Sequence, residues 1–246
     1  MWDRPTLMNA IANALYALAA LLVLGAAAGY VARLPAFAMR EVRIGNELQH
    51  VTREQIEDVV RREVKGGFFT INLAAARAAF ERLPWVRGVK VRRQWPARLD
   101  VVLEEHVPIA RWGAAALVNT HGEVFRAAYD GELPVFVGPE DAAREIAIQY
   151  RYFQRSLAAM GETPVQVQVN ARRAWQVKLQ GGLTLELGRE NIEARFARFV
   201  ALHSSTIGRL ERRIDYVDLR YANGFAVRVP ELRHEKAEPK RGRLTG

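Results

Sequence analysis

A single long apolar stretch near the N-terminus is the feature that most constrains this chain. No charged residue occurs between Pro5 and Ala32, and the centre of the stretch reads IANALYALAALLVLGAAAGYV. Crossing the hydrocarbon core of a bilayer takes roughly 20 apolar residues in a helix, and the stretch has almost none of the polar stripe that a soluble core helix normally shows. It therefore predicts a transmembrane helix over residues 11–32, preceded by a short tail of residues 1–10.

The same stretch has to be distinguished from a cleaved signal peptide. A signal peptide has a shorter apolar core of roughly 7 to 15 residues and then a small-residue cleavage site, which GAAAGYVA resembles. The length of the run favours an uncleaved anchor. Its orientation stays open on local charge: Arg33, Arg40 and Arg43 follow the run and favour a cytoplasmic location for the large part, but long domains cross the membrane largely regardless of charge.

Composition excludes some kinds of site and leaves others open. The length of 246 residues gives room for one large domain or two small ones, and half of the residues are hydrophobic, which is enough for a packed core. The absence of cysteine removes disulfides, zinc–thiolate sites and thiol nucleophiles. The net charge of +9 is compatible with nucleic acid or anionic lipid as a partner. A solvated basic surface is the simpler explanation of that charge.

Strand and helix patterns alternate closely between Met39 and Val107. MREVRIGN and the two runs WVRGVKVRRQW and RLDVVLEEHV alternate as strands do, whereas TREQIEDVVRREV and INLAAARAAFERL have helical spacing. Thr52 with Gln55 fits a capping box, and Asn72 is a fair N-cap. The order strand, helix, helix, strand, strand predicts a small α/β unit. Its expected core residues are Val42, Ile44, Ile56, Val60, Leu73, Phe80, Val89 and Val101.

The second half of the chain is rich in short strand patterns. VPIARW, AALVNTHGEVF, LPVFVGPE, VQVQVN, AWQVKL and LTLELG alternate with turn residues, and two amphipathic helices interrupt them. YVDLRYANGFAVRV reads as a final hairpin, with Asn-Gly as its turn. Amphipathic helices and half-buried strands need partner faces, so the expected fold class is α+β, with an antiparallel sheet packed with two helices.

Several separated motifs resemble one bacterial family in the same order along the chain. They are ERLPWVRGVKVRRQWPARLDVVLEEHVPIARW, ARRAW and YVDLRYANG. The strand–helix–helix–strand–strand unit resembles a POTRA domain, and the whole set resembles the FtsQ/DivIB family of cell-division proteins. The resemblance implies a POTRA domain over residues 38–107, a β domain over 108–230 and a flexible tail over 231–246.

The resemblance also implies a location and partners. It implies a single-pass protein of the cell inner membrane, with a cytoplasmic N-terminus and periplasmic domains, localised to the division septum. Such a protein is a divisome scaffold that links early and late division proteins and binds FtsB and FtsL, with FtsK, FtsW and FtsI as further contacts. No enzyme activity, cofactor, nucleic acid or small-molecule substrate is implied. The short N-terminal tail and the pair Arg228–Val229, where relatives often carry a small residue and then Trp, depart from the family pattern.

The final strand carries the predicted partner site. No later strand pattern follows it, so we expect an exposed sheet edge to which a partner adds a β-strand. The resemblance makes the periplasmic end of FtsB that partner and adds a basic residue of ARRAW facing an acidic residue of the partner. The predicted site residues are Arg172, Tyr221, Asn223, Gly224, Phe225, Ala226, Val227, Arg228 and Val229.

Two other functions stay open on sequence grounds. RRQWPAR and ARRAW combine arginine with tryptophan and would suit a membrane-tethered nucleic-acid binder. A POTRA-containing export or assembly factor is the other alternative. The five histidines are scattered, the serines lack a nucleophile-elbow context, and no glycine-rich loop has phosphate-binding spacing, so catalytic, cofactor and metal sites are not expected.

Overall fold

The computed structural model of the protein describes residues 5–32, 34, 37–39, 41–203, 205–206, 214–221 and 224–229. Contacts within the chain define two units, which meet between His106 and Val107. The predicted tails of residues 1–10 and 231–246 fall outside the described residues, except for positions 5–10.

Helix α1 is the apolar segment that the sequence predicts, and it runs from Pro5 to Ala32. Its 25 residues from Met8 to Ala32 are long and apolar enough to cross a membrane, and the protein buries none of them. At 1.5 Å per residue these 25 residues span about 38 Å, against a hydrocarbon thickness of roughly 30 Å. The helix therefore fits a transmembrane anchor.

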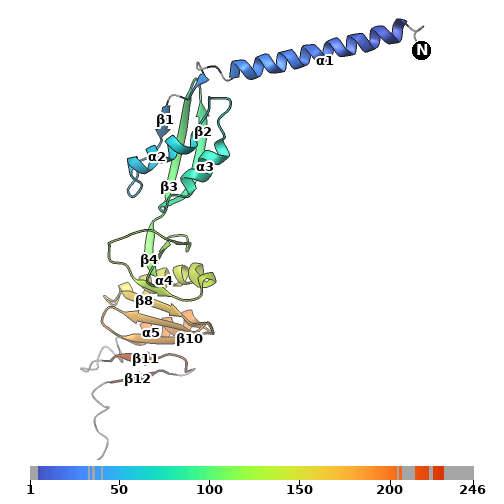
Figure 1. Ribbon diagram of the computed structural model, residues 1–246. Coiled ribbons are helices and arrows are strands. Elements are labelled where there is room, and N and C mark those ends of the chain that lie inside the picture. The colour runs from blue at the N-terminus through green and yellow to red at the C-terminus, as the bar shows by residue number, and fades with distance from the viewer. Residues whose placement is uncertain are drawn as a thin grey trace, which may run out of the picture. The chain divides into compact units, whose positions relative to one another are not determined.

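The first globular unit has the predicted strand–helix–helix–strand–strand order (Figure 1). Its three-stranded sheet has the order β1-β3-β2, in which β1 pairs with β3 in parallel and β2 pairs with β3 antiparallel. Two helices accompany the sheet. The bounds are β1 Glu41–Ile44, α2 Arg53–Glu63, α3 Leu73–Glu81, β2 Val86–Gln94 and β3 Arg98–Glu105.

Both predicted helix starts in this unit are confirmed. Thr52 and Gln55 form a complete capping box at the start of α2, because each side chain accepts a hydrogen bond from the other residue's backbone N–H. Asn72 caps α3 by accepting a hydrogen bond from the N–H of Ala75 at 3.0 Å. These caps satisfy backbone donors that have no partner inside a helix.

The predicted core of this unit is only partly right. Phe80, Val89 and Val101 are buried, as expected. The other five predicted core residues are only partly buried, and α2 contributes no fully buried side chain. Four of them, Val42, Ile44, Ile56 and Val60, line a hollow between α2 and β1, which is described with the candidate sites, whereas Leu73 lies on α3.

The second unit is built on one nine-stranded sheet. Its strand order is β12-β11-β10-β9-β8-β7-β4-β5-β6. The strands are β4 Pro108–Trp112, β5 Ala116–Asn119, β6 Val124–Phe125, β7 Val135–Val137, β8 Pro164–Val169, β9 Trp175–Leu179, β10 Thr184–Gly188, β11 Tyr216–Asp218 and β12 Ala226–Arg228. The helices are the short 3₁₀ helix η2 Glu140–Ala142, α4 Ala143–Ala158 and α5 Ile192–His203.

This sheet is mixed, whereas the sequence interpretation expected an antiparallel one. β7 pairs with β8 in parallel across α4, and β10 pairs with β11 in parallel across α5. A parallel pair needs a long crossover connection, which each helix supplies. β4 and β7 form a third parallel pair. The helices therefore set the direction of the strands as well as covering the sheet.

The core of the second unit lies on one face of the sheet. Val167, Val177, Leu185 and Val217 are registered neighbours on successive strands, and all are fully buried. Aromatic side chains from both helices join the same core, as shown by the ring centroids of Phe153 and Phe196, which are 4.5 Å apart. The opposite face carries mainly polar side chains, among them Gln166, Lys178, Thr184 and Tyr216.

Candidate functional site

Strand β12 is the end strand of the sheet within the part of the chain that the structure describes (Figure 1). It pairs antiparallel with β11, so that Ala226, Val227 and Arg228 lie opposite Asp218, Val217 and Tyr216. All three residues of β12 are exposed. Pairing uses one edge of a strand only, so the other edge of β12 has backbone N–H and C=O groups directed away from β11.

The two sides of β12 differ in chemistry. Val227 lies on the core side, because its partner Val217 is fully buried, yet 41% of Val227 remains exposed. Arg228 lies on the polar side, where its guanidinium stands 4.8 Å from the centre of the Tyr216 ring and its Nε donates to Asp215 at 3.3 Å. A strand added beside β12 would therefore meet an apolar side chain on one face and a cation on the other.

The connection between β11 and β12 is longer than the predicted Asn-Gly turn. β11 ends at Asp218 and β12 begins at Ala226, so the strands are shorter than their alternating pattern suggests. Tyr221 is 58% exposed, whereas Phe225 is half-buried and packs against the core. Asn223 lies outside the described residues. Asp218 pairs with Ala226, so residues 219–225 separate the strands instead of the two residues of a tight turn. Two sets of side-chain hydrogen bonds hold the described part of this connection.

The first of these bonds follows β11 directly. The backbone N–H of Arg220 and its guanidinium both donate to the Asp218 carboxylate. Asp218 is buried, with only 7% of it exposed. Hydrogen bonding by the Arg220 side chain, partly opposed by burial, lowers the pKa of Asp218 below its ordinary value. The pair keeps a charged carboxylate at the end of β11 and turns the chain out of the ladder.

Arg198 on α5 makes the second set of bonds. Its Nη2 donates to the backbone oxygens of Leu219, Tyr221 and Gly224 at 3.3, 2.8 and 3.4 Å. Three carbonyls of the β11–β12 connection therefore converge on one guanidinium, which ties β12 to the helix layer. The sequence interpretation missed Arg198. One arginine among several in NIEARFARFVALH has no spacing that distinguishes it.

Arg172 lies apart from β12 in the same sheet. It is exposed on the turn between β8 and β9, where its N–H donates to the side chain of Asn170 at 2.9 Å. The strand registers place this turn on the same side of the sheet as the end of β11 and the start of β12. β10 and β11 separate β9 from β12, which corresponds to about 14 Å across three strand spacings. Its neighbour Arg173 pairs with Asp141.

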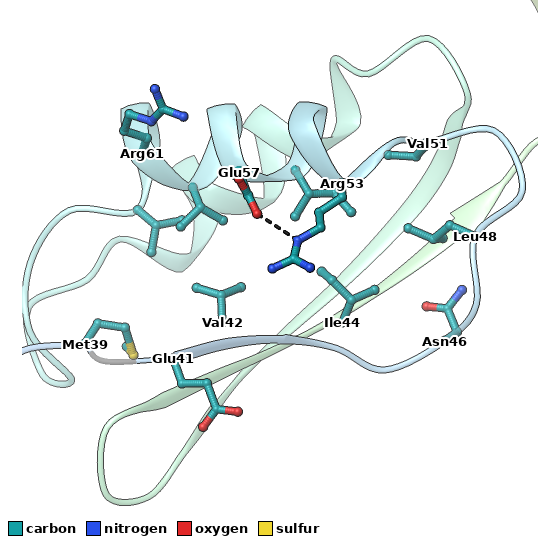
Figure 2. Close-up of a pocket in the computed structure, with 13 residues that line it drawn as sticks. Met39, Glu41, Val42, Ile44, Asn46, Leu48, Val51, Arg53, Glu57 and Arg61 are labelled. Carbon is teal, nitrogen blue, oxygen red and sulfur yellow. Dashed lines mark hydrogen bonds and ion pairs between the residues drawn. The ribbon is translucent and has the colours of Figure 1, made fainter.

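A second surface feature lies in the first unit, between β1 and α2. Figure 2 shows Val42 and Ile44 pointing from the strand toward the helix, with Arg53 and Glu57 over the space between them. The hollow has a volume of about 770 Å³. Arg53 and Glu57 form a 2.8 Å ion pair at its rim. Sequence periodicity did not predict it, because the apolar spacing of α2 indicates only which face turns inward.

An apolar anchor, a βααββ unit and a β domain that ends, among the described residues, in the edge strand β12 define a membrane-anchored protein of the POTRA class. The sequence matches the family description "POTRA domain, FtsQ-type" over residues 37–106 and "Cell division protein FtsQ/DivIB, C-terminal" over residues 110–220. The chain belongs to the FtsQ/DivIB family of cell division proteins. Strand β12 follows the second matched segment.

Curated relatives match nearly the whole chain. The cell division protein FtsQ of Nitrosospira multiformis is 47% identical over 233 residues, which cover 93% of this chain and 99% of the relative. The FtsQ of Burkholderia pseudomallei is 42% identical and covers 95% of this chain and 96% of its own. The FtsQ of Bordetella pertussis is 34% identical over 99% of this chain and 100% of its own. The protein therefore has a role in cell division, and its anchor fits a single-pass inner-membrane protein.

Proposed function

We propose that this protein is a scaffold of the division machinery that binds FtsB, together with FtsL, by strand addition to β12. The observation that carries the proposal is the position of β12, whose three residues are exposed at the end of the sheet. In strand addition, main-chain hydrogen bonds supply affinity and alternate side chains supply selectivity. The scaffold role is non-catalytic, because this mode of binding needs no reactive group.

The chemistry of the edge sets what the added strand contains. A residue beside Val227 on the core side extends the apolar layer of the sheet, so the proposal expects an apolar residue there. A residue beside Arg228 lies next to a cation, which favours an acidic or polar side chain. Arg172 offers a second cation on the turn before β9, and β9 lies about 14 Å from β12 across the sheet. The proposed partner segment therefore combines a strand with an acidic residue beyond it.

Proline substitution tests the edge directly, because proline removes a ladder donor and is tolerated in a sheet only where its N–H is not needed. One of Ala226→Pro and Val227→Pro removes an outward N–H and the other removes one that pairs with β11. The proposal expects the outward variant to stay folded by circular dichroism and to lose binding to an FtsB peptide. Arg172→Glu is expected to weaken the same binding without unfolding.

A matched control separates the edge from general charge effects. Arg189→Glu reverses another exposed arginine, whose ion pair within the described residues is with its neighbour Glu190. It is expected to bind the peptide as the parent chain does. Wild-type affinity in both folded proline variants and in Arg172→Glu would exclude β12 as the partner site.

The proposed orientation places both globular units in the periplasm and the N-terminus in the cytoplasm, at the division septum. Family membership supports this orientation, whereas the flanking charges alone leave it open. A C-terminal fusion to a reporter that is active only in the periplasm is expected to be active. An inactive fusion, with activity from a cytoplasmic reporter at the same position, would reverse the topology. FtsK, FtsW and FtsI remain further proposed contacts.

A further inference from the structure

Four aromatic side chains form one cluster in the first unit, the juxtamembrane aromatic patch: Phe37, Phe68, Phe69 and Trp95. The ring of Phe37 lies 5.3 Å from that of Phe69 and 6.4 Å from that of Trp95. The ring of Phe68 lies 5.2 and 5.4 Å from the same two rings. The outer members are largely solvent-accessible, with 53% of Phe69 and 63% of Trp95 exposed.

The patch is tied to the end of the membrane helix. Phe37 follows the last residue of α1, Ala32, by five positions, so the chain holds the two within about 18 Å of each other even when fully extended. The N–H of Phe68 donates to the carbonyl of Phe37 at 2.7 Å. Ala38 and Gly67 form an antiparallel bridge beside this bond. The segment that leaves the membrane is therefore bonded to the loop that carries Phe68 and Phe69.

Gly67 is needed for this close approach. A Cβ atom at position 67 would lie 2.7 Å from the carbonyl oxygen of Phe37, which is closer than such contacts occur. The side chain of Thr70 accepts a hydrogen bond from the Gly67 N–H at 2.9 Å and closes the loop on its other side. These contacts fix the loop between α2 and α3, which carries Phe68 and Phe69, against the juxtamembrane segment.

The remaining members come from the turn between β2 and β3. The run RRQW leads into that turn, and Arg92, Arg93 and Trp95 are all exposed. Lys65, also exposed, precedes the loop that carries the phenylalanines. Aromatic rings are enriched where a protein meets the membrane–water boundary, and basic side chains beside them are attracted to anionic lipid headgroups.

We propose that the juxtamembrane aromatic patch inserts into the interfacial layer of the bilayer that α1 spans. The ligand is the lipid surface itself, because a short stretch of chain and a backbone hydrogen bond connect the patch to the membrane anchor. Trp95 and Phe69 supply the apolar contact, and Lys65 with Arg92 supplies the attraction to headgroups. The first unit is thereby held against the membrane at one end. This inference does not depend on β12 or on the orientation of the chain.

The absence of native cysteine allows a clean test on the full chain in lipid nanodiscs. Gln94→Cys places a fluorescent label beside Trp95, and Glu47→Cys places the same label at an exposed control position. The control position is far from the patch. Its neighbour Asn46 donates to the carbonyl of Leu103, and Leu103 lies about 17 Å along β3 from Arg98, the residue at the patch end of that strand. The proposal expects quenching of the label at position 94 by lipids that carry a quencher near the headgroup, and no quenching at 47.

Substitution of the patch completes the test. Trp95→Ser with Phe69→Ser in the Gln94→Cys chain is expected to abolish the lipid quenching and to restore quenching by aqueous iodide. Val102→Ser, at an exposed apolar residue outside the patch, is the matched control and is expected to change neither signal. Both serine variants should retain the parent unfolding transition. A label at 94 that stays fully accessible to iodide in the parent chain, as at 47, would overturn the proposal.

Discussion

The guanidinium of Arg220 binds the carboxylate of Asp218 through two of its nitrogens, Nε and Nη2, although only one residue separates the two in the chain. Nε donates to Oδ1 at 2.9 Å and to Oδ2 at 3.1 Å, and Nη2 donates to Oδ2 at 2.7 Å. Asp218 is the last residue of β11, directly opposite the first residue of β12. The pair thus sets where the ladder between the two strands stops.

Asp218→Asn is expected to weaken the β11–β12 segment by about 1.5–3 kcal/mol, the range for hydrogen bonds to charged groups. The lower end is favoured because Arg220 is solvent-accessible. Since the folded-state pKa of Asp218 is lowered, its contribution is complete above the ordinary pKa of 3.8 and is lost as pH falls through the lower folded value. Urea unfolding at several pH values checks this. An Asn variant that loses stability on acidification as steeply as the parent chain would contradict it.

Arg198→Met is expected to loosen the connection between β11 and β12, because it removes a donor from three carbonyls while keeping a long apolar stem. Amide hydrogen exchange at Val227 and Arg228 should accelerate, while exchange in β8 and β9 should not change. Arg189→Met, which removes only an exposed ion pair, is the control. Unaltered exchange in β12 of the Arg198 variant would show that the helix does not hold the edge strand.

Glu105→Gln is expected to destabilise the first unit by about 1–3 kcal/mol. The carboxylate accepts hydrogen bonds from the N–H groups of Gln49, His50 and Val51 at 2.8, 3.0 and 2.7 Å. Burial opposes its charge, but these bonds together outweigh burial and lower the pKa of Glu105. Its stabilising effect is therefore present above the ordinary pKa of 4.5 and is lost as pH falls through the folded value.

The neighbouring Glu104 supplies the control for that measurement. It pairs with Arg87 at 2.7 Å on the surface, where such pairs contribute roughly 0–1 kcal/mol. Thermal unfolding should therefore separate the two glutamine variants clearly. Equal loss of stability in Glu104→Gln and Glu105→Gln would mean that the three backbone bonds are not the source of the effect.

Phe80→Ala is expected to cost roughly 3–5 kcal/mol, because Phe80 is fully buried and its removal leaves a cavity. Ile56→Ala on α2 should cost clearly less, since Ile56 borders the open hollow and its loss uncovers little new surface. Urea midpoints of the two variants give the comparison. Equal costs would indicate that α2 closes onto β1 in solution.

Local signals in the sequence predicted much of the fold. Thr52 and Asn72 are caps that depend on neighbours three positions away, and strand alternation depends on the two faces of a sheet. The strand direction could not be predicted in this way, because the parallel pairing of Leu185 with Val217 is set by packing of α5 on the sheet. The hollow beside Val42 depends on the spacing of two elements, which periodicity does not encode.

In the candidate site, the edge strand could be predicted from the sequence, whereas the contacts of the β11–β12 connection could not. An alternating strand with no later strand pattern predicts an edge, and β12 occupies the end of the sheet. The exposure of Tyr221, the half-burial of Phe225 and the role of Arg198 all depend on the connection between β11 and β12. That connection is organised by side-chain bonds between residues up to 26 positions apart, as in the contact of Arg198 with Gly224. A two-residue turn signal carries no information about such bonds.

The parallel pairing of β10 with β11 has a consequence for the timing of assembly. β11 and β12 are synthesised after the seven other strands of their sheet, and β11 can pair in parallel with β10 only when the connection that contains α5 has been made. Until then the growing sheet ends at β10, which presents a different row of backbone groups. The edge formed by β12 thus exists only in chains that have completed this last folding step, so it distinguishes a finished β domain from a nascent one.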